Sequence, residues 1–138
     1  YDISYQSLHR IFLNDDIEVF QRDWIERMLG QAIQSHTGAV GAKLLYPRST
    51  TIQHCGVHNY EDRPDHIFAH GDDRVDYYFD LNHIEFNCLA VTAACLMVSK
   101  DKYREVGGFN EELAVTFNDI DFCLKILTLS YQGVFSSS

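Results

Sequence analysis

The sequence predicts an α/β fold with a mixed sheet flanked by helices. Segments rich in β-branched and aromatic residues alternate with segments whose apolar residues recur at helical spacing. Of the 138 residues 46% are apolar, and they include nine Phe and eight Tyr, which is typical of a globular protein. A chain of this length can bury a modest core, so we expect residues 1–138 to form one domain.

The first half of the chain predicts a strand, a helix and two more strands. Residues 7–13 (SLHRIFL) predict a strand that ends in a polar run. Asp23 is expected to cap a helix that stops near Gly38, with Glu26 as its capping-box partner. Residues 39–45, closed by Pro47, and the β-rich residues 50–57 predict the next two strands. The expected buried face of the helix consists of Trp24, Ile25, Met28, Leu29, Ala32 and Ile33.

The second half opens on a polar stretch without a clean period. Residues 59–76 contain Pro64 and Gly71, and we expect a loop there. Residues 86–99 are largely apolar and are expected to include a buried strand at Cys95–Ser99.

The last elements follow from capping signals. Ser99 is expected to cap a short helix through Val106 that ends at two glycines. A helix over residues 119–129, with Asn118 as its N-cap, and a final strand around residues 133–135 complete the prediction.

Charge and cysteine usage narrow the class of protein. The formal net charge of −9 disfavours binding to nucleic acid and to anionic lipid surfaces. No stretch approaches the ~20 apolar residues of a membrane span, and no secretory signal opens the chain. The cysteines (Cys55, Cys88, Cys95 and Cys123) form no CxxC pair, so we expect buried, reduced thiols. These features favour a cytoplasmic protein, or one at the cytoplasmic face of the membrane.

The run Asn14-Asp15-Asp16 follows the first predicted strand directly. Mg²⁺ and Mn²⁺ take oxygen ligands, and open α/β sheets bind ligands at the carboxyl ends of their strands. A metal site is therefore one interpretation of this run. A solvated turn is the alternative that the residue types alone favour.

Two acidic residues lie at the start of the last helix. At ~100° per residue Asp119 and Asp121 point to nearly opposite sides of it, so they cannot share one role. Asp121 occupies the capping-box position. Asp119 lies in the first turn, where the helix dipole favours the ionised form that could accept a proton from a hydroxyl group. A purely helix-stabilising role is an equal alternative.

Histidines four residues apart raise zinc as a further alternative. The pairs are His54 with His58 and His66 with His70. The first pair lies in a β-rich stretch, where this spacing does not bring side chains together, and no HExxH motif is present. No phosphate-binding loop and no GxSxG elbow occurs either.

Taken together, several segments resemble the family 2 glycosyltransferases of the GT-A fold, especially those that build bacterial surface polysaccharides. They occur in the family's order over most of the chain: residues 12–19 (FLNDDIEV), 23–25 (DWI), 40–47 (VGAKLLYP), 51–57 (TIQHCGV), 92–98 (TAACLMV), 105–111 (EVGGFNE) and 117–125 (FNDIDFCLK). The resemblance implies the metal and acceptor half of a GT-A domain, with the nucleotide-binding half lying before Tyr1.

The resemblance also implies residue roles and partners. Asn14 and Asp16 would hold Mg²⁺ or Mn²⁺, Asp15 and Asp16 would contact the nucleotide-diphospho-sugar donor, and Asp119 would be the general base of an inverting transfer. Residues that would shape the sugar or acceptor pocket are Gly107, Gly108, Phe109 and Asn118. The acceptor would be a glycan or a lipid-linked glycan.

The nucleotide-binding half that the resemblance places before Tyr1 leads to two further expectations. The 138-residue chain alone is expected to be inactive. Exposed sheet edges make a homodimer an option. The competing interpretation is a non-catalytic glycosyltransferase-like module for binding or assembly.

Overall fold

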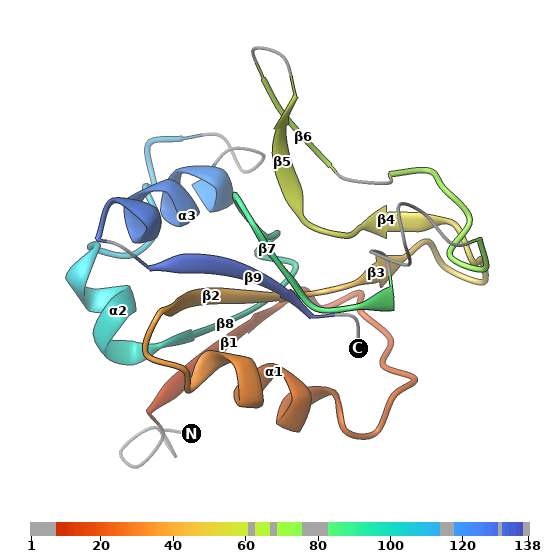
Figure 1. Ribbon diagram of the computed structural model, residues 1–138, viewed down its shortest axis with the longest axis horizontal. Helices are drawn as coiled ribbons and strands as arrows, with labels where there is room; N and C mark the ends of the chain where they lie inside the picture. Colours follow the sequence, from red (N-terminus) through yellow and green to blue (C-terminus); the bar gives the residue numbers. More distant parts are fainter. Residues whose placement is uncertain are drawn as a thin grey trace.

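The computed structural model describes residues 8–60, 63–66, 69–75, 83–113, 118–129 and 131–136. Its elements follow in the order β1 (His9–Leu13), α1 (Trp24–Ala32), β2 (Thr37–Ala42), β3 (Leu44–Leu45), β4 (Ile52–His54), β5 (Val57–Tyr60), β6 (Arg63–His66), β7 (Phe86–Cys88), β8 (Cys95–Ser99), α2 (Lys100–Glu105), α3 (Asn118–Thr128) and β9 (Gln132–Ser136) (Figure 1).

A five-stranded mixed sheet organises these elements, with the strand order β1-β8-β2-β9-β7. Strands β2 and β9 pair in parallel, whereas β8 runs antiparallel to both β1 and β2, and β7 runs antiparallel to β9. Helices α1 and α3 lie on opposite faces of this sheet, and the β5–β6 hairpin projects away from it (Figure 1). The predicted α/β class with a mixed sheet flanked by helices is confirmed, and it is compatible with part of a nucleotide-sugar transferase fold.

Strand β2 is buried along its whole length because both of its faces are covered. Successive strand residues point to opposite faces, so the strand contributes to two separate cores. On one face Val40 and Ala42 pack with Met28 of α1. On the other face Ala39 belongs to the cluster that contains Phe122 and Ile126 of α3.

Gly41 provides a close approach that no other residue allows at this position. A Cβ built on Gly41 would lie 2.4 Å from Val91 Cβ, well inside van der Waals contact. The absence of a side chain at Gly41 therefore lets the segment that precedes β8 lie directly against β2.

Several predicted elements are confirmed with small changes in their bounds. The strand Cys95–Ser99 lies where the sequence places it, and α1 ends at Ala32, before the expected stop at Gly38. Ser99 caps α2 as expected, because its side chain accepts the N–H of Lys102 at 3.2 Å. The capping box of α1 is wrong: Asp23 precedes the helix but its side chain makes no capping hydrogen bond.

Other predictions are corrected by strand pairing. The strand predicted over residues 39–45 divides into β2 and β3, and residues 50–57 divide at Gly56, whose φ of 90° lies in the left-handed region. The loop predicted over residues 59–76 is wrong in its first part, which belongs to the β5–β6 hairpin. Strand β7 was not predicted as a separate element.

The last helix also differs from its prediction. Helix α3 includes Asn118 as its first residue instead of being capped by it, and residue 117 lies outside the described part of the chain. Asp121 does not complete a capping box; its carboxylate forms an ion pair with Lys125 at 2.9 Å. This pair has the i, i+4 spacing that places two side chains on one helix face.

All four cysteines are buried and free, as the sequence predicts. Desolvation raises the pKa of Cys55, Cys88 and Cys123 to about 12 and that of Cys95 to about 11. The thiols are therefore protonated at neutral pH and pack as small apolar groups. Separately, no helix among the described residues is long and apolar enough to cross a bilayer.

We predict that Gly41→Ala lowers the free energy of unfolding by about 1–3 kcal/mol, because the new methyl group overpacks the contact with Val91. Gly30→Ala is the matched control. A Cβ at Gly30 of α1 meets no atom within 4 Å, and the change should add about 0.5–1 kcal/mol through helix propensity. Urea denaturation measures both values, and a Gly41→Ala protein as stable as the wild type would contradict the prediction.

We also predict that the native thiols react slowly with a disulfide reagent at pH 8. A pKa near 12 instead of 9 lowers the thiolate fraction about a thousandfold, and the thiolate is the reactive form. Because the folded state keeps these protons longer than the unfolded state, stability should fall as the pH rises from 9 towards 12. Thiol titration before and after denaturation tests the slow reaction, and melting temperatures measured against pH test the loss of stability. Rapid labelling of a native thiol at pH 8 would refute the prediction of slow reaction.

Candidate functional site

Residues 91–94, here named the site loop, lead into β8 and lie outside regular secondary structure. Each N–H of the loop donates to a side chain: Val91 to Cys123 Sγ (3.5 Å), Thr92 to His54 Nε2 (3.2 Å), Ala93 to Asp119 Oδ2 (3.3 Å) and Ala94 to Thr92 Oγ1 (3.3 Å). Buried or half-buried backbone groups need such partners when no strand supplies them. Side chains from β4 and α3 therefore fix the path of this loop.

Asp119 joins the first turn of α3 to the site loop. Its half-buried carboxylate accepts two backbone N–H groups, Ile120 N–H at Oδ1 (2.8 Å) and Ala93 N–H at Oδ2 (3.3 Å). Cys123 lies one helical turn later on the same face and contacts Val91. The predicted catalytic carboxylate is thus held in a defined position.

The predicted metal-binding run forms an exposed turn at the end of β1, here named the acidic turn (residues 14–16). Because Leu13 pairs with Cys95, the turn begins opposite the site loop. Asn14 N–H donates to Ala94 O at 3.0 Å, and Asn14 O accepts Ile17 N–H at 3.4 Å. The acidic turn and Asp119 are therefore attached to neighbouring residues of one loop.

The donor set of the acidic turn fits a metal that is shared with a ligand. Among the described residues, no group of three or more His, Cys, Asp or Glu side chains could hold a metal by itself. Mg²⁺ is commonly bound by only one or two carboxylates, with substrate phosphates and water completing its shell. The exposed side chains of Asn14, Asp15 and Asp16 offer oxygen atoms for such an arrangement.

The residues predicted to shape an acceptor pocket have structural roles. Gly107 and Gly108 adopt φ values of 79° and 72° after α2, and Gly108 N–H donates to Tyr103 O at 3.0 Å, as in a helix C-cap. Asn118 begins α3 next to Asp119. Phe109 packs its ring against three others, those of Phe12 (4.9 Å between centroids), Tyr103 (5.9 Å) and Phe122 (4.8 Å). Their role in acceptor binding stays a prediction.

Of the four histidines of the alternative zinc site, two have described side chains, and each of these makes other contacts. His54 is fully buried, and its Nε2 accepts the N–H groups of Gly56 (3.3 Å) and Thr92 (3.2 Å). The side chains of His58 and His66 lie outside the described residues. The ring of His70 stacks on Tyr46, with 5.8 Å between centroids. The sequence gives no direct signal for the role of His54, because its partners are backbone groups of remote segments.

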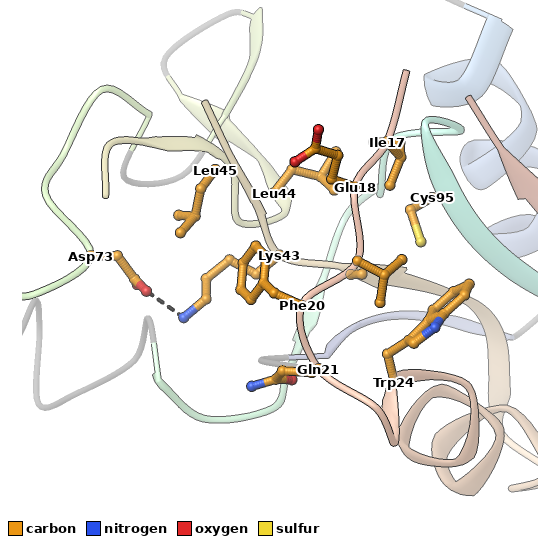
Figure 2. Close-up of a pocket in the computed structure, with 12 residues that line it drawn as sticks. Ile17, Glu18, Phe20, Gln21, Trp24, Lys43, Leu44, Leu45, Asp73 and Cys95 are labelled. Carbon is orange, nitrogen blue, oxygen red and sulfur yellow. Dashed lines mark hydrogen bonds and ion pairs between the residues drawn. The ribbon is translucent and has the colours of Figure 1, made fainter. Parts of the chain in front are cut away.

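A cavity of about 130 Å³ adjoins the acidic turn, and the sequence did not predict it. It is lined by residues that follow the turn, by the ends of β2 and β3, and by Cys95. Figure 2 shows Lys43 and Asp73 facing each other at one end of the cavity, and Trp24 with Cys95 at the other. Lys43 Nζ lies 2.9 Å from Asp73 Oδ1, and these side chains are only 11% and 17% exposed. A lysine inside the apolar run VGAKLL is the sequence signal that could have pointed to this pair.

Comparison with known proteins identifies relatives, although no family model and no solved structure matches the chain. The chain is similar to an uncharacterized protein of Sinorhizobium fredii, y4gI, with 39% identity over 134 residues that cover 90% of this chain and 14% of that protein. It is also similar to the O-antigen biosynthesis protein RfbC of Myxococcus xanthus, with 32% identity over 130 residues, or 90% of this chain and 10% of that protein. The chain therefore spans only a small part of each relative.

We predict that Asp73→Asn or Lys43→Met lowers the free energy of unfolding by about 1–3 kcal/mol, because each removes one charge of an ion pair that lies in a largely buried place. Arg74→Ala is the control, since the pair of Arg74 with Asp72 is exposed and should matter much less. Chemical denaturation of the three variants tests the difference. Equal losses for the buried and the exposed pair would contradict it.

Proposed function

We propose that this chain is the metal and acceptor half of an inverting glycosyltransferase that uses a nucleotide-diphospho-sugar in polysaccharide synthesis. The observation that carries the proposal is the attachment of the acidic turn and Asp119 to neighbouring residues of the site loop. Similarity to a protein named for O-antigen biosynthesis supports the substrate class. The acceptor is then a glycan or a lipid-linked glycan.

Each residue has a defined task in this reaction. The acceptor oxygen attacks the anomeric carbon, the bond from that carbon to the phosphate oxygen breaks, and the nucleoside diphosphate leaves with the electron pair. Asp119 accepts the proton of the acceptor hydroxyl on a carboxylate oxygen. Its two backbone N–H partners hold that carboxylate in place before the substrate arrives.

The acidic turn holds the divalent cation in this proposal. Asp16 and Asn14 would bind Mg²⁺ or Mn²⁺ through side-chain oxygens, and Asp15 would contact the donor. When bound, the metal neutralises negative charge on the diphosphate. The exposure of all three side chains suits a metal that enters together with its nucleotide.

We predict that Asp16→Ala abolishes Mn²⁺-dependent binding of UDP and sugar release from nucleotide sugars, whereas Asp119→Asn keeps the binding and lowers the release about 10²- to 10⁴-fold. Isothermal titration and release assays on the complete gene product measure the two effects. Asp23→Asn is the matched control, because Asp23 is an exposed acid of the same region without a capping bond.

The outcomes separate the proposal from its alternative. A wild-type protein that binds nucleotide sugar but releases no sugar would instead support a non-catalytic binding module. Release that survives both Asp16→Ala and Asp119→Asn would overturn the assignment of these residues.

A further inference from the structure

His54 is a buried polar residue that the proposed reaction does not use. It lies on β4 with a side chain that is 1% exposed. Its Nε2 accepts hydrogen bonds from two backbone N–H groups, those of Gly56 and Thr92. A backbone N–H can only donate, so Nε2 carries no proton and the neutral ring carries its proton on Nδ1.

The two donors belong to different parts of the fold. Gly56 turns the chain between β4 and the β5–β6 hairpin with a left-handed φ of 90°. Thr92 belongs to the site loop. One nitrogen atom of His54 therefore joins the base of the hairpin to the loop that carries the candidate site.

The bond to Thr92 constrains the rest of the loop. Peptide units are rigid, and two dihedral angles separate the N–H of one residue from that of the next. The N–H that follows Thr92 belongs to Ala93 and donates to Asp119 at 3.3 Å, and the carbonyl of Ala94 accepts the N–H of Asn14 at 3.0 Å. A displacement of Thr92 therefore also displaces Ala93, which contacts Asp119, and Ala94, which contacts the acidic turn.

We propose that His54 is a positioning residue for this site, and that its Nε2 acceptor holds the site loop in the orientation that Asp119 and the acidic turn require. This inference rests on the proposed function, because only that function makes the positioned groups catalytic. It assigns to His54 neither a contact with substrate nor a metal.

Acceptor chemistry, and not volume, is what this role requires. An apolar side chain of similar size could fill the space but would leave the Gly56 and Thr92 N–H groups without a partner. Glutamine extends far enough to place an amide oxygen near the position of Nε2. The shorter asparagine places its oxygen near the position of Nδ1 instead.

The experiment compares His54→Gln with His54→Phe and His54→Asn in the 138-residue chain labelled with ¹⁵N. A hydrogen bond to a carboxylate changes when the carboxylate is protonated, so the amide signal of Ala93 should titrate together with Asp119 in the wild type. Asp119→Asn removes this titration and identifies its source. Long-range ¹H–¹⁵N spectra of the wild-type imidazole should show the Nδ1–H tautomer.

We expect His54→Gln to keep the Ala93 titration and His54→Phe and His54→Asn to lose it, while circular dichroism shows folded proteins. Unchanged titration in folded His54→Phe overturns the proposal, and so does an Nε2–H tautomer in the wild type. If His54→Phe does not fold, the comparison of His54→Gln with His54→Asn decides: equal Ala93 titration in these two variants overturns the proposal. If His54→Gln also fails to fold, His54 is a core residue and the positioning role is refuted.

Turnover distinguishes this inference from the proposed function. Where the complete gene product releases sugar, His54→Phe should lower kcat roughly 10- to 100-fold and raise the KM for the donor, because Asp119 and the acidic turn are both displaced, and His54→Gln should rescue both values. Wild-type kcat in His54→Phe, with activity lost in Asp119→Asn, refutes the role of His54 alone. Activity that is unaffected in Asp119→Asn refutes the proposed function, while the Ala93 spectra still decide the role of His54.

Discussion

The four consecutive backbone N–H groups of the site loop lie outside the sheet and still require hydrogen-bond acceptors. This requirement constrains the elements that surround the loop. In the described part of the chain, side chains of β4, of α3 and of the loop itself accept these groups. Helix α3 must therefore present Asp119 and Cys123 on one face, and β4 must bring His54 inwards. The same contacts that satisfy the loop also bring the polar groups of the candidate site together.

The apolar core sets where this loop can lie. Strand β2 is buried on both faces, and its glycine allows Val91 to rest directly on the sheet. Val91 anchors the apolar end of the loop, while its other end meets the acidic turn at the end of β1. Rigid, buried strands thus support polar residues at their edge, where open α/β sheets bind ligands.

Sequence patterns predicted the elements whose signal lies within a single segment. The helical period of α1 and the apolar run of β8 needed no knowledge of their neighbours. Asp119 and the acidic turn were singled out by the family resemblance, because residue types alone left a helix-stabilising role and a solvated turn open. The β5–β6 hairpin and β7 were missed because pairing with other strands, and not local propensity, defines them. His54 was missed as an acceptor for the same reason, since its donors come from a glycine turn and from a loop 38 residues away.

The parallel pairing of β2 with β9 joins segments about 95 residues apart in the sequence. Closing such a long loop costs conformational entropy before the new contacts stabilise it. We therefore expect this pairing to form late in folding. On a ribosome, β2 leaves the exit tunnel long before its partner is synthesised. Until then one edge of its apolar surface stays unpaired, and such edges are sites where unfinished chains associate. The strand at the centre of the finished sheet is thus the one that most needs protection during synthesis.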